Sequence, residues 1–317
     1  MILITGANGF VGRSLCAVLA QSGQAVVAVT RHALPDRATN IVNCQIRALT
    51  IDTDWQHSLQ GCDAVVHLAA RVHVMTDTAA DPLSEFRRVN VDGTLNLARQ
   101  AAAAHVRRFI FISSIKVNGE ATRLGQAFTS ADVPNPQEPY SISKHEAEQG
   151  LCKVAEETGM EVVIIRPPLV YGPRVRANFQ SMMRWLKRGV PLPLGAIHNK
   201  RSLVALDNLV DLIITCLDHP AAANQTFLVA DGEDLSTTEL LRRMGEALGS
   251  PAWLIPVPIS LLEAGAALLG RRDMAQRLCG SLQVDILKTR DLLGWNPPIS
   301  VDEGLRRTVQ GLNENGA

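Results

Sequence analysis

The sequence has no excess of charge of either sign. Its 317 residues include 31 basic and 31 acidic side chains, so the formal net charge is zero. The arginine pairs are spread along the chain and form no basic block: Arg87-Arg88, Arg107-Arg108, Arg242-Arg243, Arg271-Arg272 and Arg306-Arg307. A surface dedicated to nucleic acid is therefore not expected.

Long hydrophobic runs and paired cysteines are also missing. The longest apolar stretch, IPVPISLLEAGAALLG, contains Glu263 and two prolines and is too short to span a bilayer, so we predict a packing helix and no membrane insertion. No C-x-x-C pair occurs among the cysteines, and most of them lie in apolar segments: Cys16, Cys44, Cys62, Cys152, Cys216 and Cys279. This pattern predicts reduced thiols, no metal site and a cytoplasmic protein.

Short apolar runs rich in β-branched residues alternate with helical patterns. The first run, MILIT, is typical of a core strand and not of a leader peptide, and AVVAVT, DAVVHLA, RRFIFIS and EVVIIRP follow. Apolar strands separated by helices predict a parallel sheet covered on both faces, which is a Rossmann-like doubly wound α/β fold. We assign residues 1–166 to this nucleotide-binding domain and expect the chain to return to it around 202–230.

The pattern changes after Pro167. Residues 167–200 contain many prolines and glycines, strand-like pieces return briefly at SLVAL and TFLVA, and residues 236–317 have mostly helical patterns. We therefore predict that residues 167–317 form mainly a smaller, mostly helical, substrate-binding lobe.

A glycine-rich turn, TGANGFVG, follows the first strand and opens a helix. Gly6, Gly9 and Gly12 are spaced three apart, with Phe10 and Val11 between them. Glycines in such a turn let the backbone approach a pyrophosphate, which then lies at the amino end of the helix. The sequence therefore predicts a dinucleotide site.

The end of the second strand bears on the choice of dinucleotide. A site that prefers NAD places a carboxylate there for the ribose hydroxyls, whereas this chain reads AVVAVTRH, with Thr30 and Arg31 and no acid. Because a guanidinium suits a 2′-phosphate, the sequence favours NADP(H) without excluding NAD(H). The alternative is that Arg31 is a solvated loop residue.

Two further segments carry candidate catalytic groups. The motif PYSISK places Tyr140 and Lys144 four residues apart, on one face of a helix. A lysine ammonium beside a phenol lowers the pKa of the phenol, so we predict that Tyr140 is an acid or base near neutral pH. The segment SSIKVNG places Ser114 at the end of the apolar run FIFI. No nucleophile elbow G-x-S-x-G supports a hydrolase, and His67 is expected to be a packing residue.

Five motifs occur in order: Gly-x-x-Gly-x-x-Gly, HLAA, a serine-bearing strand end, Tyr-x-x-x-Lys and RPPLVYGP. With them the chain resembles, over nearly its whole length, the extended short-chain dehydrogenases/reductases of the nucleotide-sugar (UDP-glucose 4-epimerase-like) epimerase/dehydratase group. The resemblance implies a UDP-sugar substrate and a homodimer that pairs helices 81–104 and 139–158 in a four-helix bundle.

The resemblance also implies roles for matching residues. Ser114 would hydrogen-bond the sugar oxygen, Tyr140 would exchange the proton, and Lys144 would hold the nicotinamide ribose. Asn90 in VNVDGT matches an asparagine that supports the lysine, and Asn118 stands where tyrosine is usual. The other cofactor-binding positions are Leu49, Leu68, Ala69, Ala70 and Pro167.

On the substrate side, Arg201 in RSLVALDNLVDLI matches an arginine that meets the nucleotide diphosphate. Asn178 suits a phosphate contact at the start of a helix, and Arg277 is a further candidate. Two departures weaken the match: Leu169 replaces a substrate-binding asparagine, and Ala48 replaces a cofactor-binding aspartate.

The residues after Ser114 limit the chemistry. Dehydratases of this family need an acid pair there, and this chain has Ile115 and Lys116, so 4,6-dehydration is not expected. Lys116 is either a substrate contact or a solvated loop lysine. Two reactions at C4 remain, epimerisation with bound NAD and reduction of a 4-keto sugar by NADPH.

Arg31 and the missing acid favour the reductase. The string from RVHVM to RSLVALDNLVDLI also resembles a bacterial polysaccharide-biosynthesis subgroup thought to reduce UDP-4-keto-6-deoxy-N-acetylhexosamines, which implies a role in O-antigen (lipopolysaccharide) biosynthesis. A third reading, a regulatory protein that binds NADP without turnover, is disfavoured because Ser114, Tyr140 and Lys144 are all present.

Overall fold

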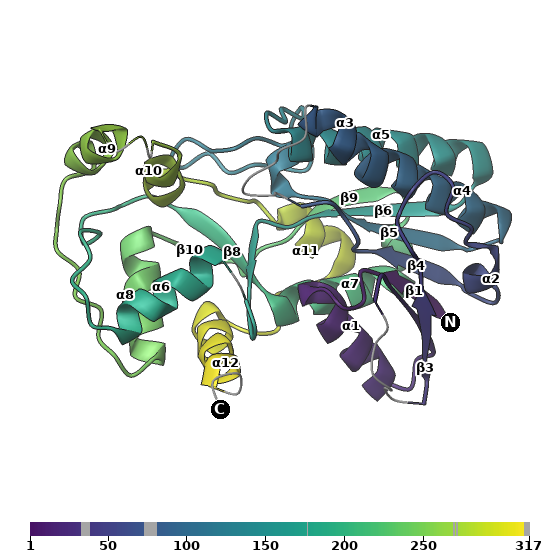
Figure 1. The fold of residues 1–317 in the computed structure, drawn as a ribbon, viewed down its shortest axis with the longest axis horizontal. Helices are drawn as coiled ribbons and strands as arrows, with labels where there is room; N and C mark the ends of the chain where they lie inside the picture. Colours follow the sequence, from purple (N-terminus) through teal and green to yellow (C-terminus); the bar gives the residue numbers. More distant parts are fainter. Residues whose placement is uncertain (33–38, 73–80, 176, 269, 271, 314–317) are drawn as a thin grey trace.

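The computed structural model describes residues 1–32, 39–72, 81–175, 177–268, 270 and 272–313 (Figure 1). Seven strands form a parallel sheet in the order β3-β2-β1-β4-β5-β6-β9. Their bounds are β1 Ile2–Thr5, β2 Val26–Thr30, β3 Ile41–Gln45, β4 Ala64–His67, β5 Arg108–Ile112, β6 Glu161–Arg166 and β9 Gln225–Leu228. The predicted doubly wound α/β fold is confirmed.

Helices cover both faces of this sheet (Figure 1). On one face lie α1 (Phe10–Gln21), α7 (Leu206–Asp218) and α11 (Leu287–Leu293). On the other lie α2 (Gln56–Leu59), α3 (Pro82–Arg87), α4 (Thr94–Ala103) and α5 (Pro139–Thr158). Alternate residues of β1 point into the two cores, because Ile2 and Ile4 pack with α1 and α7 whereas Leu3 packs with α4 and α5.

The helix expected at 81–104 is not continuous. A π-helical turn, η1 (Arg88–Gly93), separates α3 from α4. Gly93 lies tightly against Leu49, since a side chain at Gly93 would begin 2.8 Å from Leu49 Cγ. Turns of this kind are rare and recur at functional sites, and this one contains Asn90.

A second sheet, β10-β8-β7, lies in the smaller lobe. Its strands are β7 (Leu169–Tyr171), β8 (Arg201–Ala205) and β10 (Asp234–Leu235). The helices of this lobe are α6 (Ala177–Lys187), α8 (Thr237–Ala247), α9 (Ile259–Leu268), α10 (Arg272–Cys279) and α12 (Val301–Asn313). We expected residues 202–230 to return to the large sheet. In this segment α7 and β9 lie with the large sheet, whereas β8 belongs to the small one. The segment is thus divided between the two sheets, and the domain boundaries stay a prediction.

The sequence predicted a packing helix in IPVPISLLEAGAALLG and unpaired, reduced cysteines. Within the described ranges no helix has the length and apolar character needed to cross a bilayer. The expected packing helix, α9, contacts α10 but buries none of its residues fully. None of the cysteines, all of which lie in the described ranges, is in a disulfide; Cys16, Cys62 and Cys216 are buried, whereas Cys152 is exposed.

A buried carboxylate joins the two sheets. Asp231 follows β9 in the chain. It accepts hydrogen bonds from Tyr171 Oη at 2.7 Å, Ala205 N at 2.8 Å and Asn208 Nδ2 at 2.7 Å. These donors come from β7, β8 and α7. Asp231 therefore fixes the smaller lobe against the sheet that holds the glycine turn.

We predict that Asp231→Ala lowers the free energy of unfolding by about 3 kcal/mol or more, because buried donors lose their acceptor. Urea denaturation monitored by circular dichroism measures the loss. Asp63→Ala is the control, since Asp63 pairs with Arg107 on the surface and such pairs contribute roughly 0–1 kcal/mol. Equal losses in the two variants would contradict a structural role for Asp231.

Candidate active site

The predicted cofactor residues lie at one edge of the large sheet. Because its strands are parallel, their carboxyl ends share this edge, and the strand order reverses between β1 and β4, where α/β sheets bind ligands. Segments that leave the edge contain Gly6 after β1, Arg31 after β2, Leu68, Ala69 and Ala70 after β4, Ser114 after β5, and Pro167 after β6.

The glycine turn forms a close backbone cradle. Gly6 has a φ of +67°, and a side chain there would begin 3.0 Å from Ala69 N. A side chain at Gly12 would begin 2.2 Å from Gly6 O, which a real structure does not allow. Gly9 is the N-cap residue of α1 and has no side chain to cap the helix. The first backbone amides of α1 therefore face the turn without a hydrogen bond from a capping side chain. These residues fit a dinucleotide pyrophosphate.

A buried hydrogen-bond chain supports the two strands beside this turn. Thr5 Oγ1 lies 2.7 Å from His67 Nδ1, and His67 Nε2 lies 2.9 Å from Thr94 Oγ1. Burial lowers the pKa of His67 to about 3, so the ring is neutral. Thr5 Oγ1 also accepts from the amides of Leu68 and Ala69. His67 is thus a packing residue, as expected from the sequence.

The remaining predicted cofactor positions come from the glycine turn itself and from two other segments of the chain. Leu49 is buried against Gly93, and Phe10 and Val11 are partly buried in the first turn of α1. Arg31 is exposed at the end of β2, and its carbonyl accepts from Gln45 Nε2 at 3.2 Å.

Local sequence explains why α5 begins at the catalytic motif. Pro139 occupies the first helical position, and Glu138 and Ser141 form a reciprocal capping box. Tyr140 is therefore in the first turn and Lys144 in the second. The Tyr140 ring meets Phe86 edge to face at 6.2 Å between centroids, and Lys144 Nζ lies 4.1 Å from the Phe111 ring centroid.

The pKa values of this pair differ from our prediction. Burial raises the pKa of Tyr140 to about 12 and lowers that of Lys144 to about 7, while Glu148 acts to raise the latter. The expectation that Lys144 lowers the phenol pKa is therefore wrong for this structure, because burial disfavours the charged phenolate and raises the pKa of Tyr140. At neutral pH the phenol keeps its proton.

Asn90 acts on α5 through Ser143. Its Nδ2 donates to Ser143 Oγ at 3.0 Å, and Ser143 Oγ donates to the carbonyl of Tyr140 at 2.7 Å. The amide of Asn90 also bonds both backbone groups of Arg71. Asn90 thus holds the residue next to Lys144, which gives Ser143 a structural role that the sequence did not suggest.

Ser114 lies at the turn that follows β5. It is the N-cap residue of η2 (Ile115–Val117), and its Oγ accepts from Lys116 N at 3.2 Å. Ile115 N donates to Pro167 O at 3.0 Å. The turn is therefore held to the end of β6, with the Ser114 side chain partly buried.

Lys116 is not a free loop lysine. Its Nζ lies 2.6 Å from Glu138 Oε2 and 2.9 Å from Glu120 Oε2. Nothing in SSIKVNG indicated the bond to Glu138, because Glu138 is 22 positions away, whereas Glu120 is four residues from Lys116. The ammonium links the Ser114 turn to the N-cap of α5.

A buried ion pair behind the site was also missed by sequence reasoning. Arg166 bonds both carboxylate oxygens of Glu148, at 3.0 and 2.6 Å, and donates to Asn118 Oδ1 at 2.9 Å. Asn118 Nδ2 donates to Thr129 O. The arginine of RPPLVYGP could have indicated this, since a buried guanidinium needs a carboxylate. Asn118, in place of the usual tyrosine, completes the network.

On the substrate side the structure brings two of the predicted residues together. Arg201 Nη1 donates to Arg277 O at 2.9 Å and to Gly280 O at 3.0 Å. Asn178 lies at the start of α6, and its side chain is outside the described part. Leu169 is exposed at the start of β7.

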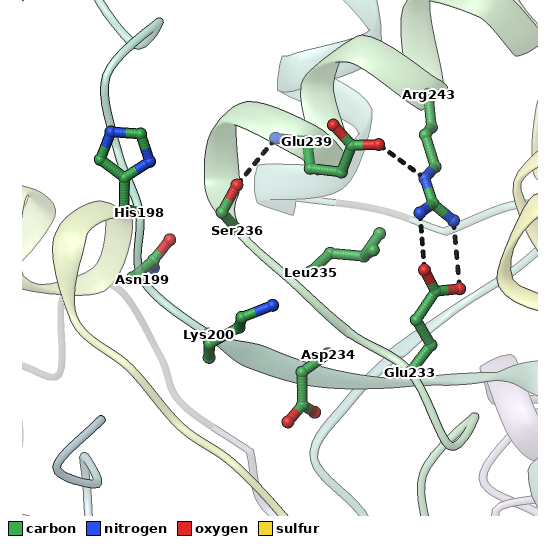
Figure 2. A pocket seen from close by; sticks show the side chains of 9 residues that line it. All are labelled: His198, Asn199, Lys200, Glu233, Asp234, Leu235, Ser236, Glu239 and Arg243. Atoms are coloured by element: carbon green, nitrogen blue, oxygen red, sulfur yellow. Dashed lines mark hydrogen bonds and ion pairs between the residues drawn. The ribbon is translucent and has the colours of Figure 1, made fainter. Parts of the chain in front are cut away.

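A separate hollow of about 280 Å³ lies between the β8–β10 strands and α8 (Figure 2). Arg243 pairs there with Glu233 and Glu239, and Ser236 caps α8. None of its lining residues is a predicted site residue. The charged groups of this hollow mostly satisfy one another, so we assign it no ligand.

Comparison with known proteins identifies the family. Residues 2–230 match the model of the NAD dependent epimerase/dehydratase family. The chain belongs to this family. The predicted membership of the extended short-chain dehydrogenase/reductase enzymes is confirmed, whereas the predicted closeness to 4-keto-hexosamine reductases is not.

Individual relatives are epimerases and a reductase. The chain is 49% identical to UDP-glucose 4-epimerase of Vibrio cholerae, over 98% of this chain and 95% of the relative. It is 26% identical to GDP-6-deoxy-D-mannose reductase of Pseudomonas aeruginosa, over 96% and 94%. The structure of a Thermotoga maritima UDP-glucose 4-epimerase with UDP-glucose superimposes with a TM-score of 0.80 at 23% identity, over 100% and 99% of the chains.

We predict that Gly12→Ala abolishes measurable dinucleotide binding, because the added methyl group displaces Gly6 from the cradle. Titration calorimetry with NAD and NADP measures the affinity. Gly265→Ala on α9 is the control, since nothing lies within 4 Å of a side chain there. Unchanged affinity in Gly12→Ala would show that the dinucleotide binds elsewhere.

Proposed function

We propose that the protein is a nicotinamide-dependent enzyme that acts at C4 of a UDP-sugar and interconverts the two C4 epimers. The observation that carries the proposal is the meeting of the glycine cradle, Ser114 and α5 at one sheet edge. The Vibrio cholerae relative supports the substrate class and the epimerisation. The family description and the NAD in a Bacillus cereus UDP-glucuronic acid 4-epimerase structure support NAD as cofactor.

The residues of the site suit this chemistry. When bound in the cradle, the dinucleotide supplies a hydride acceptor for C4 and, once reduced, a hydride donor. Because the phenol of Tyr140 starts protonated and the pKa of Lys144 is lowered to about 7, the amine of Lys144 first takes the phenol proton. The Tyr140 phenolate then takes the proton of the C4 hydroxyl as the C4 hydride leaves, and returns it after the keto sugar has presented its other face. Ser114 donates a hydrogen bond to the same oxygen, and protonated Lys144 favours the phenolate during each transfer.

A second candidate is reduction of a UDP-4-keto-6-deoxy-N-acetylhexosamine by NADPH in O-antigen biosynthesis. Arg31 favours it, because an exposed guanidinium at the end of β2, where a site that prefers NAD carries an acid, suits a 2′-phosphate. The protonated phenol of Tyr140 also suits proton donation to a 4-keto oxygen. The similarity to the GDP-6-deoxy-D-mannose reductase of Pseudomonas aeruginosa supports this candidate.

We predict that the purified protein converts UDP-glucose or UDP-N-acetylglucosamine to the C4 epimer with no net consumption of NADH. Capillary electrophoresis of the sugar nucleotides, with and without added NADH or NADPH, measures this. Turnover only of UDP-4-keto sugars, with one NADPH consumed per product, would select the reductase. Binding without turnover of any sugar would select the regulatory reading. The predicted homodimer is tested by light scattering of the same sample.

We predict that Tyr140→Phe lowers kcat about a hundredfold to ten-thousandfold while KM changes little, because the phenol acts in the transition state. Steady-state kinetics with the best UDP-sugar measures both. Lys144→Met should cost at least as much, since it removes the charge beside the phenol, and Ser114→Ala should cost less. Near-normal turnover by Tyr140→Phe would refute the assignment.

A further inference from the structure

We infer that Lys116 is a positioning residue of the C4 reaction, because its ammonium clamps the turn that carries Ser114 to the start of the helix that carries Tyr140. The inference rests on the proposed function, which assigns Ser114 and Tyr140 to the same sugar oxygen. The two side chains come from different elements, η2 and α5, so their separation depends on what joins those elements.

One end of the clamp is fixed to Ser114. Lys116 N donates to Ser114 Oγ at 3.2 Å, so the backbone of Lys116 and the hydroxyl of Ser114 share a hydrogen bond. Val117 N also donates to Ser114 O, which closes the turn. A shift of Lys116 therefore shifts Ser114.

The other end is fixed to the beginning of α5. Lys116 Nζ lies 2.6 Å from Glu138 Oε2, and Glu138 caps the helix through the amide of Ser141. Tyr140 lies between these two capping residues. A short charge-assisted bond to the N-cap residue therefore fixes the turn beside the first helical turn.

The same turn has a second, buried attachment to α5. Asn118 bonds Arg166, which bonds Glu148 two turns further along the helix. These side chains are 3–5% exposed, so changing them would disturb the core. Lys116 and Glu138 are 32% and 34% exposed, and such pairs contribute little to global stability. The exposed attachment can therefore be removed without unfolding the protein.

Loss of the ammonium also leaves two acids facing the turn. Glu120 Oε2 lies 2.9 Å from Lys116 Nζ, so the lysine holds both carboxylates. With a neutral side chain at position 116, Glu120 and Glu138 would repel each other. The turn would then move away from α5, and the Ser114 hydroxyl would lose its alignment with the phenol of Tyr140.

The test is a double-mutant cycle on kcat. We expect Lys116→Met to lower kcat about tenfold with KM changed less than about twofold, because misplacement of a catalytic group acts on the transition state. Lys116→Arg should restore most of kcat, since it keeps the bond to Glu138. In the Ser114→Ala background, Lys116→Met should cost little more, because there is no hydroxyl left to align.

Arg107→Met is the matched control. Arg107 is likewise a cation paired with carboxylates, those of Asp63, Glu161 and Asp218, with 39% exposure, but it precedes β5 and lies at the opposite edge of the sheet. The Arg107→Met variant should therefore leave kcat unchanged.

Three results would overturn the inference. They are an unchanged kcat in Lys116→Met, a loss confined to KM as for a direct substrate contact, or an equal loss with and without Ser114. If Ser114→Ala and Tyr140→Phe also leave turnover intact, the proposed function fails with it; if those two variants lose activity, only the role of Lys116 fails.

Discussion

Parallel pairing of β1 with β2 and β4 is the interaction on which the rest of the molecule depends. Ile2 is in register with both Val26 and Ala64, and Thr5 with both Val29 and His67, so the three strands end side by side. Their following segments must then leave at one edge. Because the strand order reverses at β1, the glycine turn and the residues after β4 face each other, and the cradle forms there.

Buried charges fix the two edges of the sheet. At the catalytic edge, Arg166 and Glu148 join β6 to α5. At the other edge, Arg108 is almost fully buried; it bonds Glu161 and the carbonyls of Cys216 and His219 at the end of α7. A guanidinium suits a helix carboxyl end, where carbonyls lack partners. Such pairs contribute little net stability but are costly to break, so they fix where the helices lie.

Local patterns predicted most of the fold and part of the site. Apolar runs gave β1, β2, β4, β5 and β6, and glycine spacing gave the cradle, because these features depend on neighbouring residues. The contacts of Lys116 with Glu138 and of Arg166 with Asn118 join positions far apart in sequence, and no local pattern identifies these partners. The pKa of Tyr140 was predicted in the wrong direction because burial is set by the whole packing around α5. Segment 119–135 forms hydrogen bonds to Ser281 and Gln283 in the smaller lobe. No local sequence pattern predicted these contacts either.

The central claim is that hydride leaves C4 of a UDP-sugar at the site of Tyr140. The most direct measurement uses UDP-hexoses that carry deuterium at C4, with rapid quenching during turnover and mass spectrometry of the reduced nicotinamide, which holds the transferred hydride before it returns to C4. The account predicts deuterium on the nicotinamide with the wild-type protein and almost none with Tyr140→Phe. A nicotinamide that stays unlabelled with every UDP-sugar, or one that is labelled equally by both proteins, would contradict it.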